Sequence, residues 1–323
     1  MLAVQIARTG GPEVLELVEL PRPEPGPGQI LVRHQAIGLN FIDTYMRSGL
    51  YPLPLPAILG SEGAGVVEAV GEGVTRFEPG DRVAHGAAGR GAYAEFQALP
   101  EDRVSKLPDG IDVKTAAAAM LKGMTAEFLV RRCYPLKAGE PCLIWAASGG
   151  VGSILSQWAK AIGAMVIGCV GSEAKADIAR SHGCDHVILY KSEDVAARVR
   201  EITGAAGVRV SYDGVGKASF EASLKSLGRR GMLVSFGNAS GAVPPFEPLA
   251  LSRAGSLYLT RPTMVDYAAT VEELDACAAA VFEVILSGAV KIEIGREYAL
   301  RDVRKAHEDL HAGETVGSQL LIP

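Results

Sequence analysis

The sequence has no surplus of positive charge and no long uninterrupted hydrophobic run. Its 323 residues include 32 Lys and Arg against 37 Asp and Glu, which gives a formal net charge of −5. An acidic chain without a basic stripe is poorly suited to nucleic acid or to an anionic membrane surface. The most apolar stretch, residues 142–171, is interrupted by Ser148, Ser153, Gln157 and Lys160, whereas a membrane span needs roughly 18 consecutive apolar residues. We therefore expect neither a nucleic-acid partner nor membrane insertion.

Cysteine is also scarce. The five cysteines are odd in number and scattered, and none forms a C-x-x-C pair. Such residues are typically small buried apolar side chains in a reducing compartment. Residues 1–5 lack the basic and apolar regions of a signal peptide. These features predict a globular, cytoplasmic protein.

Glycine, by contrast, is abundant: the chain has 38 glycines, and 48% of its residues are hydrophobic. This hydrophobic content excludes a disordered chain, and the glycines follow no three-residue collagen period. Glycine weakens helices and strands unless a special backbone geometry requires it. The length predicts about two domains, within which the glycines should mark tight turns and close approaches.

The first 110 residues are typical of a small β-barrel or sandwich. Short runs rich in β-forming residues are separated by Gly, Pro and Asp turns. The predicted strands are 2–7, 14–20, 30–37, 64–70, 82–85 and 92–99, and a turn at residues 10–13 joins the first two as a hairpin. An alanine-rich helix should begin after Asp112, its predicted N-cap, and run to about Cys133.

From residue 141 short apolar runs alternate with helical segments, which is typical of βαβ units and a doubly wound parallel sheet. The predicted strands are 142–146, 165–170, 186–190, 208–212, 232–236 and 256–260, and the predicted helices are 151–162, 173–181, 193–202 and 220–227. After residue 262 follow a helix over 267–287, a short strand, a helix over 302–312 and a strand over 319–322. These last pieces are too few to form a domain alone. We expect residues 1–122 and 261–323 to form one domain and residues 123–260 the other.

A glycine motif between the first strand and the first helix of the second domain predicts a dinucleotide site. It reads Ala147-Ser148-Gly149-Gly150-Val151-Gly152 and resembles G-x-G-x-x-G, with Ala147 in place of the first glycine. Gly149 lets the backbone approach a pyrophosphate at the helix N-terminus, and Gly152 permits tight packing of helix on strand. A tight turn without a ligand is the alternative.

The end of the next strand favours NADPH over NADH. No acidic residue stands at its tip to bind a ribose 2′-hydroxyl, whereas Gly171, Ser172 and Lys175 offer space, a hydroxyl and a cation for a 2′-phosphate. Tyr190, at the end of the following strand, is expected beside the adenine. The alternatives are that Lys175 is a solvated residue of a helix's first turn and that Glu173 favours NAD.

Longer motifs resemble one family. Residues 38–52 (GLNFIDTYMRSGLYP), 121–125 (LKGMT), 234–241 (VSFGNASG), 260–263 (TRPT) and 319–323 (QLLIP) are similar to those of the zeta-crystallin-type quinone oxidoreductases, in the medium-chain dehydrogenase/reductase superfamily. The resemblance spans nearly the whole chain. It implies an α/β protein with a GroES-like β-rich catalytic domain, a Rossmann domain, NADPH as cofactor and a zinc-free site in the cleft between the domains.

The zinc-free reading depends on two positions. Zinc-dependent relatives place a cysteine where this chain has Asn40 and a histidine where it has Ser61, within a Gly-His-Glu motif. An amide and a hydroxyl provide no soft ligands for Zn²⁺. The cysteine-rich lobe that holds structural zinc in those relatives is also missing.

The resemblance also implies site residues. Asn40, Asp43, Tyr45 and Tyr51 are expected near the nicotinamide and the substrate, where the tyrosines can donate hydrogen bonds or form aromatic walls for a flat quinone. The other implied cofactor contacts are Thr125, Phe236, Gly237, Asn238 and Arg261, the last at the phosphates. The alternative for Asp43 is an Asx turn or a buried ion pair, and for Tyr51 it is packing within a proline-rich loop.

Residues 307–311 (HEDLH) fit the H-E-x-x-H pattern of zinc metalloproteases. No third ligand is apparent nearby, and Val303, Ala306 and Leu310 predict a core-facing stripe opposite a solvated polar face. We therefore expect this match to be coincidental. The other histidines, at positions 34, 85, 182 and 186, are expected to be isolated structural residues.

The predicted function is zinc-independent transfer of reducing equivalents from NADPH to quinones. Reduction of the activated C=C bond of an α,β-unsaturated ketone or aldehyde is an alternative within the same fold. A non-catalytic NADPH-binding or structural protein is an alternative of another class. A homodimer is expected from the resemblance and from the apolar segment Leu257-Tyr258-Leu259, which would extend a sheet across a two-fold axis.

Overall fold

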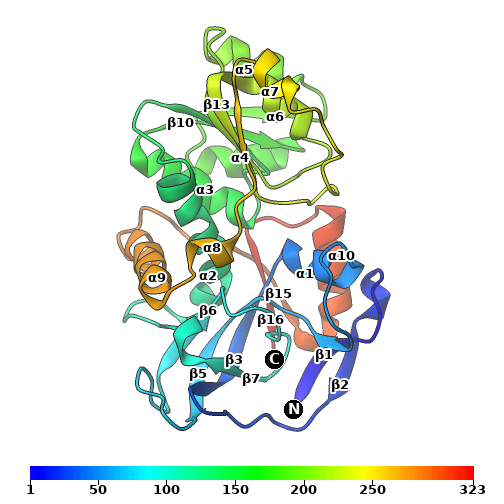
Figure 1. Ribbon diagram of the computed structural model, residues 1–323, viewed down its shortest axis with the longest axis vertical. Helices are drawn as coiled ribbons and strands as arrows, with labels where there is room; N and C mark the ends of the chain where they lie inside the picture. The colour runs from blue at the N-terminus through cyan, green and yellow to red at the C-terminus, as the bar shows by residue number, and fades with distance from the viewer. The chain divides into compact units, whose positions relative to one another are not determined.

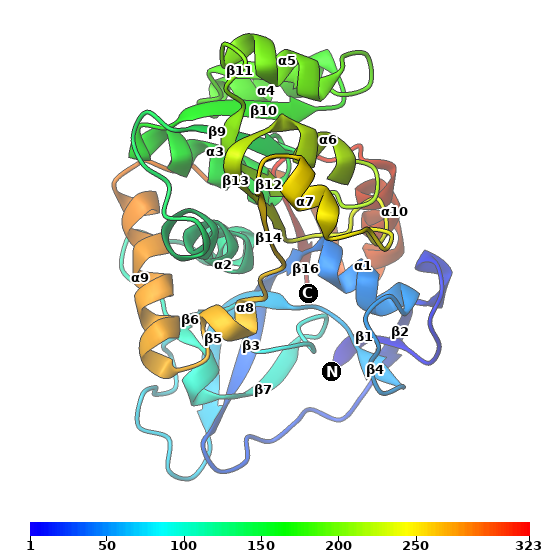
Figure 2. The ribbon, with the colours of Figure 1, turned by 45° about the horizontal axis from the view of Figure 1, so that its top comes forward.

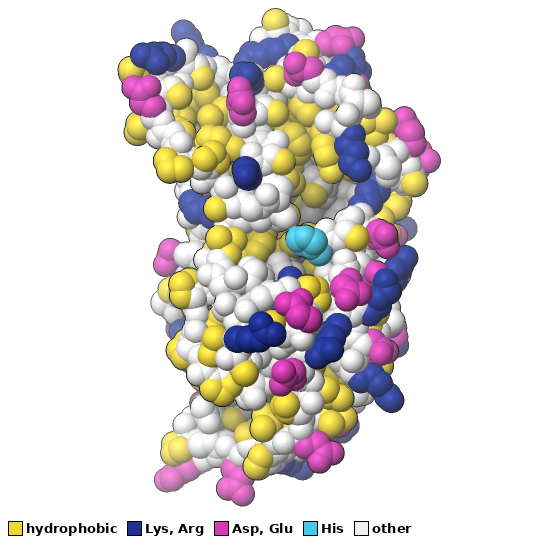
Figure 3. Space-filling view, turned by 90° about the vertical axis from the view of Figure 1, so that its right-hand side faces the viewer, with side chains coloured by type: hydrophobic (Ala, Val, Ile, Leu, Met, Phe, Trp, Pro, Cys, Tyr) yellow, Lys and Arg dark blue, Asp and Glu magenta, His cyan; other side chains and the backbone are white.

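The computed structural model describes residues 1–323, which divide into two compact units (Figure 1). Unit 1 comprises Met1–Met124, Tyr267–Ser287 and Ile292–Pro323, and unit 2 comprises Thr125–Asp266 and Gly288–Lys291. No helix has the length and apolar character needed to cross a membrane. On the face drawn in Figure 3, acidic and basic side chains are interspersed rather than gathered by sign.

Unit 1 is built around a seven-stranded sheet. Along the sheet its strands are β15 (Ile294–Ala299), β16 (Ser318–Ile322), β3 (Gln29–Leu39), β5 (Glu62–Val70), β6 (Arg82–His85) and β8 (Ser105–Lys106), while β7 (Phe96–Pro100) also pairs with β3. A three-stranded sheet holds β2 (Glu16–Glu19), β1 (Leu2–Ile6) and β4 (Ala57–Ile58). Because β16 pairs antiparallel with β3, with Leu320 opposite Gly38, the end of the chain lies inside the sheet that the N-terminal residues begin.

The helices of unit 1 include one that the sequence analysis did not predict. They are α1 (Phe41–Ser48), α2 (Val113–Phe128), which crosses into unit 2, α9 (Val271–Leu286) and α10 (Val303–Ala312), with 3₁₀ turns at Pro12–Val14, Glu101–Arg103 and Leu300–Asp302. The unexpected helix is α1. It begins at a capping box, in which Asn40 is the N-cap and Asp43 the third helical residue, and it ends at Gly49 with φ of 82°.

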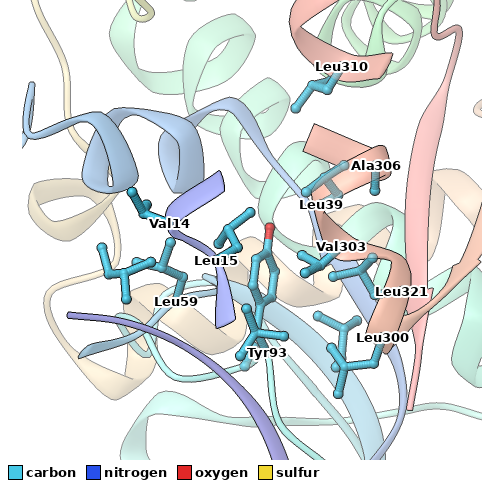
Figure 4. Packing of buried hydrophobic residues seen from close by; sticks show 14 of the residues in the cluster. Val14, Leu15, Leu39, Leu59, Tyr93, Leu300, Val303, Ala306, Leu310 and Leu321 are labelled. Carbon is cyan, nitrogen blue, oxygen red and sulfur yellow. The ribbon is translucent and has the colours of Figure 1, made fainter. Parts of the chain in front are cut away.

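The core of unit 1 joins β1, β3 and α10. Val303, Ala306 and Leu310 of α10 are buried in a cluster with Leu39 and Tyr93, so the predicted apolar stripe is confirmed (Figure 4). The predicted strand at 92–99 begins later, at Phe96, because Tyr93 belongs to a loop that hydrogen-bonds to the segment around Leu59.

Unit 2 contains a six-stranded parallel sheet, which confirms the predicted doubly wound fold. Its strands lie in the order β11 (His186–Leu189), β10 (Met165–Val170), β9 (Pro141–Trp145), β12 (Val208–Asp213), β13 (Leu227–Ser235) and β14 (Tyr258–Thr260). In sequence order this is 3-2-1-4-5-6, which is typical of dinucleotide-binding domains. All the strands end at one edge, where ligands bind in such sheets.

Five helices connect successive strands of unit 2: α3 (Gly150–Ile162), α4 (Glu173–Ser181), α5 (Val195–Ile202), α6 (Phe220–Ser226) and α7 (Leu249–Arg253). The first four contact the sheet (Figure 2). A short helix, α8 (Met264–Tyr267), follows β14, and a π-helical turn at Leu129–Cys133 ends α2. Leu143, Ile167, Val208 and Leu233 from four neighbouring strands are fully buried in the main cluster of this unit. The sheet is therefore a rigid support for the loops at its carboxyl edge.

Candidate functional site

The glycine loop after β9 brings backbone into direct contact with backbone. The Gly149 N–H donates to the Ala146 carbonyl over 2.8 Å, and Ala146 itself is left-handed, with φ of 53°. A Cβ atom on Gly152 would overlap the Ala146 carbonyl oxygen and lie 2.8 Å from its carbon. The N-cap of α3 is Gly149, which offers no side-chain acceptor to the first-turn N–H groups. Such an end is suited to an anion.

The tips of β10 and β11 bring a tyrosine and two lysines together. A Cβ on Gly171 would lie 2.8 Å from the Tyr190 hydroxyl and 3.4 Å from Cε of Lys191. Lys175 is partly buried, and its pKa is lowered, first by loss of water and then by repulsion from Lys191. Lys191 was not predicted from the sequence as a site residue, although Lys191 directly follows Tyr190. Two cations with Ser172 beside them can hold a phosphate dianion.

Tyr190 lies on an aromatic neighbour. Its side chain is 44% exposed, and its ring centroid is 5.9 Å from that of Trp145, the last residue of β9. The Trp145 indole N–H is buried and has no hydrogen-bond partner in the protein. An exposed ring backed by a second ring offers a flat apolar surface to a base.

A buried carboxylate organises the loop after β12. Asp213 accepts hydrogen bonds from the N–H groups of Val215 and Gly216, at 2.9 and 3.0 Å, and from the hydroxyls of Ser219 and Ser223. Asp213 was not predicted from the sequence as a site residue. Its signal was the Asp-Gly-Val-Gly run at the end of a predicted strand.

The loop after β13 rests on the loop after β12. A Cβ on Gly237 would overlap the Gly214 carbonyl oxygen and lie 2.8 Å from the Gly214 Cα. Arg261 donates from Nη1 to the carbonyls of Ser235 and Gly237, each at 2.9 Å. The structure thus places Arg261 as a brace for the loop that carries Phe236, Gly237 and Asn238.

In unit 1, Asp43 gathers the residues around the start of α1. It accepts from the Asn40 N–H over 3.0 Å, from the Ser61 hydroxyl over 2.7 Å and from the Tyr93 hydroxyl over 3.0 Å. Asp43 is 0% exposed. Burial raises its pKa to about 6, and these hydrogen bonds and the Lys122 charge oppose the rise. Asp43 is thus the third residue of a capping box and a buried acceptor at once.

A buried ion pair stands beside this cluster. Lys122 Nζ lies 2.6 Å from Glu62 Oε2, and both side chains are almost completely buried. Glu62 also accepts from the Asn40 amide over 2.9 Å and from the Leu121 N–H over 2.7 Å. Asn40 is thereby held between two carboxylates, through its backbone by Asp43 and through its side chain by Glu62.

Two tyrosines lie on and after α1. Their ring centroids, in Tyr45 and Tyr51, are 5.3 Å apart and the rings meet edge to face, while the Tyr51 N–H donates to the Tyr45 carbonyl over 3.1 Å. They form an aromatic corner with two phenol groups, close in sequence to Asn40. Thr125 belongs to α2 and is buried.

The histidines differ from expectation. His307 of the HEDLH segment is completely buried between Arg47 and Tyr93, whereas His311 is exposed. The predicted solvated polar face of α10 is therefore wrong at His307, and also at Asp309, which is buried. His34 and His85 are not isolated, because their Nε2 atoms lie 3.0 Å apart. The structure contains no group of three or more His, Cys, Asp or Glu residues that could hold a metal ion.

Comparisons with known proteins agree with this geometry. The family model described as the alcohol dehydrogenase GroES-like domain matches residues 26–109, and the model described as zinc-binding dehydrogenase matches residues 150–279. A quinone oxidoreductase of Pseudomonas aeruginosa is 52% identical over 99% of both chains. A 2-haloacrylate reductase of Burkholderia is 40% identical over 100% of this chain and 99% of its own. The crystal structure of Escherichia coli quinone oxidoreductase complexed with NADPH covers 100% of both chains with a TM-score of 0.98 and 46% identity.

Proposed function

Because this chain belongs to the zeta-crystallin-type quinone oxidoreductases, we propose that it transfers reducing equivalents from NADPH to quinones. The observation that carries the proposal is that two lysines, Lys175 and Lys191, lie close together beside Gly171. They stand at the edge of a sheet whose strand order is typical of dinucleotide-binding domains. Such a cationic edge suits the phosphate that distinguishes NADPH from NADH. Bound NADPH supplies the hydride, while the protein binds and orients the reactants.

We assign the cofactor site to the carboxyl edge of unit 2. The loop of Gly149, Gly150, Val151 and Gly152 presents its backbone to the pyrophosphate, and Ser172 and Lys175 bind the 2′-phosphate beside Gly171. Tyr190 supports the adenine. The remaining assigned contacts, toward the nicotinamide half of the cofactor, are Asn40, Thr125, Phe236, Gly237 and Asn238, with Arg261 bracing the last loop.

We assign the substrate contacts to α1 and the residues after it. Tyr45 and Tyr51 offer phenol hydrogen bonds to a quinone oxygen and aromatic surfaces to its ring. Asp43 acts as a positioning residue, because it is fully buried and holds Asn40 by the backbone. The edge-to-face contact of the two tyrosines and the family resemblance support these assignments.

The residues do not fit a zinc ion at this position. Asn40 donates its amide hydrogen to Glu62, and Ser61 donates its hydroxyl hydrogen to Asp43. Zinc needs lone pairs from thiolate, imidazole or carboxylate groups, and both of these side chains are engaged as hydrogen-bond donors. The reaction is therefore assigned without a metal-dependent step.

A direct assay tests the proposed function. The purified chain should oxidise NADPH when 1,4-benzoquinone is added, and the rate should be unchanged after dialysis against EDTA. A panel that includes an α,β-unsaturated ketone and 2-chloroacrylate separates quinone reduction from C=C reduction, which the similarity to 2-haloacrylate reductase makes the second candidate. NADPH binding without turnover on any member of the panel would instead support a non-catalytic protein.

The cofactor preference has its own test. Lys175→Gln removes a charge-assisted contact worth about 1.5–3 kcal/mol, so the KM for NADPH should rise at least about tenfold. The KM for NADH should stay the same, because NADH has no 2′-phosphate. Lys225→Gln, which changes an exposed lysine of α6, is the matched control. Equal losses with both cofactors would contradict the assignment.

We also propose a cytoplasmic homodimer. The edge strand β14 has an unpaired side, and its Tyr258 side chain is 57% exposed, so a second copy can extend the sheet across a two-fold axis. The five cysteines are all free, which suits a reducing compartment. Sedimentation of a monomer at micromolar concentration would refute the dimer.

A further inference from the structure

Four buried polar side chains form a continuous chain in unit 1. Arg47 Nη1 lies 2.9 Å from His307 Nδ1, and His307 Nε2 lies 3.0 Å from the Tyr93 hydroxyl. That hydroxyl lies 3.0 Å from Asp43 Oδ2. Arg47 is 5% exposed and the other three side chains are 0% exposed. The proposed reaction gives no role to Tyr93, His307 or Arg47.

The hydrogen bonds of this chain all run in one direction. A guanidinium has only donors, so Arg47 donates to Nδ1 of His307, and the ring hydrogen must be on Nε2. His307 then donates to the Tyr93 oxygen, and Tyr93 donates to Asp43. The low pKa of His307, about 3, agrees with a neutral ring, and its cause is burial, followed by the Arg47 charge. The chain is therefore polarised from a cation to a carboxyl group.

The surroundings of the chain are apolar. Figure 4 shows the Tyr93 ring among Leu15, Leu39 and Val303. A hydrogen bond in such a medium is strong, and an unpaired polar group there is costly. Removing the Tyr93 hydroxyl therefore leaves the buried His307 Nε2–H without an acceptor and takes away one of the three donors that Asp43 has.

Both ends of this hydrogen-bonded series of side chains lie on α1. Asp43 belongs to the first turn and Arg47 to the last turn of that helix, while the two middle members come from the loop before β7 and from α10. A helix bound at both ends cannot rotate or slide without breaking at least one bond. The same helix carries Tyr45 and has Asn40 as its N-cap.

We propose that Tyr93 and His307 are positioning residues, whose hydrogen bonds clamp both ends of α1 and so hold Asn40 and Tyr45 in place for the reaction. The kinetic consequence rests on the proposed quinone reduction. The structural consequence, a fixed α1, does not.

The kinetic test uses Tyr93→Phe in the full chain, which removes one oxygen and keeps the ring. We expect kcat with quinone to fall about tenfold, with the KM for NADPH unchanged. Asp43 faces Ser61, the Asn40 N–H and Tyr93 and is influenced by the Lys122 charge, while Glu62 contacts Asn40 and Lys122. Losing the Tyr93 donor raises the Asp43 pKa. Because protonated Asp43 no longer accepts from the Asn40 N–H as a carboxylate, kcat should fall at low pH, and the midpoint of this fall should lie about one pH unit higher in the variant.

The matched control is Tyr298→Phe. Tyr298 also donates to a buried carboxylate, Asp309 of α10, over 2.8 Å, but neither residue hydrogen-bonds to α1. In this control the dependence of kcat on pH should stay unchanged. His307→Gln, which retains a donor for Tyr93, should keep more activity than His307→Leu. Equal effects of Tyr93→Phe and Tyr298→Phe would overturn the proposal.

Hydrogen exchange gives a readout that needs no turnover. In Tyr93→Phe the amides of residues 40–44 should exchange at least about tenfold faster than in the unchanged chain, and in Tyr298→Phe they should not. A wild-type chain that reduces no quinone would overturn the proposed function, while this exchange difference would still support the clamp. Unchanged exchange in Tyr93→Phe would overturn the clamp even in an active enzyme.

Discussion

At the carboxyl edge of the sheet in unit 2, backbone packs directly on backbone. Around α1 in unit 1, by contrast, the backbone is fixed by hydrogen bonds and an ion pair of buried ionisable side chains. Gly152 and Gly237 leave no room for a Cβ beside the carbonyls they touch. Asp43 and Glu62 instead depend on hydrogen-bond donors supplied from distant segments. The first arrangement is sensitive to added volume and the second to lost charge, so different substitutions should damage the two units.

The largest expected effect comes from adding one methyl group to unit 2. Gly152→Ala puts a Cβ against the Ala146 carbonyl, where every close neighbour is backbone and cannot move aside. We expect unit 2 to lose its folded structure and NADPH binding. Gly149→Ala is the control, because its Cβ would lie 3.2 Å from the same oxygen; it should stay folded and bind NADPH more weakly. Circular dichroism and NADPH fluorescence measure both.

A smaller effect is expected from removing one charge in unit 1. Lys122→Met leaves Glu62 buried without its cation, which should cost about 3–5 kcal/mol of unfolding free energy. The double variant Lys122→Met with Glu62→Leu should recover part of this loss, since no charge is then left unpaired. A single variant as stable as the original chain in urea would show that the pair contributes nothing.

The smallest effect is a graded response to acid. Burial lowers the pKa of His34 to about 4 and that of His307 to about 3, and it lowers that of His85 well below its usual range. The unfolded chain therefore takes up protons on these groups from about pH 6.5 downward, before the folded chain does, and stability falls with pH. Asp43 opposes this, because its raised pKa of about 6 makes the folded chain bind the extra proton.

The three histidines outweigh the one carboxyl group. Near pH 5 the unfolded chain therefore binds about two protons more than the folded chain, and the free energy of unfolding falls by on the order of 2–3 kcal/mol per pH unit as the pH is lowered. All four groups belong to unit 1. Amide hydrogen exchange should be compared at about pH 7, 6 and 5. As the pH is lowered, the amides of unit 1 should lose protection before those of unit 2. Equal protection of both units at low pH would remove the contrast between them.

The sequence was most informative where a local pattern decides the structure. The alternation of apolar runs and helices predicted the strands of unit 2, because each element is specified by its own residues. The glycine loop could be placed for the same reason. Helix α1 was missed because it is short, although the Asn40–Asp43 spacing and Gly49 were signals for its two ends.

The buried clamp could not be predicted. Its members are far apart along the chain: Tyr93 and His307 are separated by 214 positions, and Arg47 and His307 by 260. The apolar stripe of α10 predicted a solvated position for the polar His307. The periodicity of a helix indicates which face is apolar, but not which polar residue finds a buried partner. Such pairs are set by the tertiary fold alone.

The place of β16 has a consequence for how the protein is made. Residues 318–322 lie between β15 and β3, so the sheet of unit 1 is incomplete until they have been synthesised. On the ribosome all of unit 2 emerges earlier, while residues 37–39 of β3, beyond the part that pairs with β7, still lack a partner strand. An open edge in a nascent chain invites pairing with other chains. Unit 1 thus begins to be translated before unit 2 and closes after it.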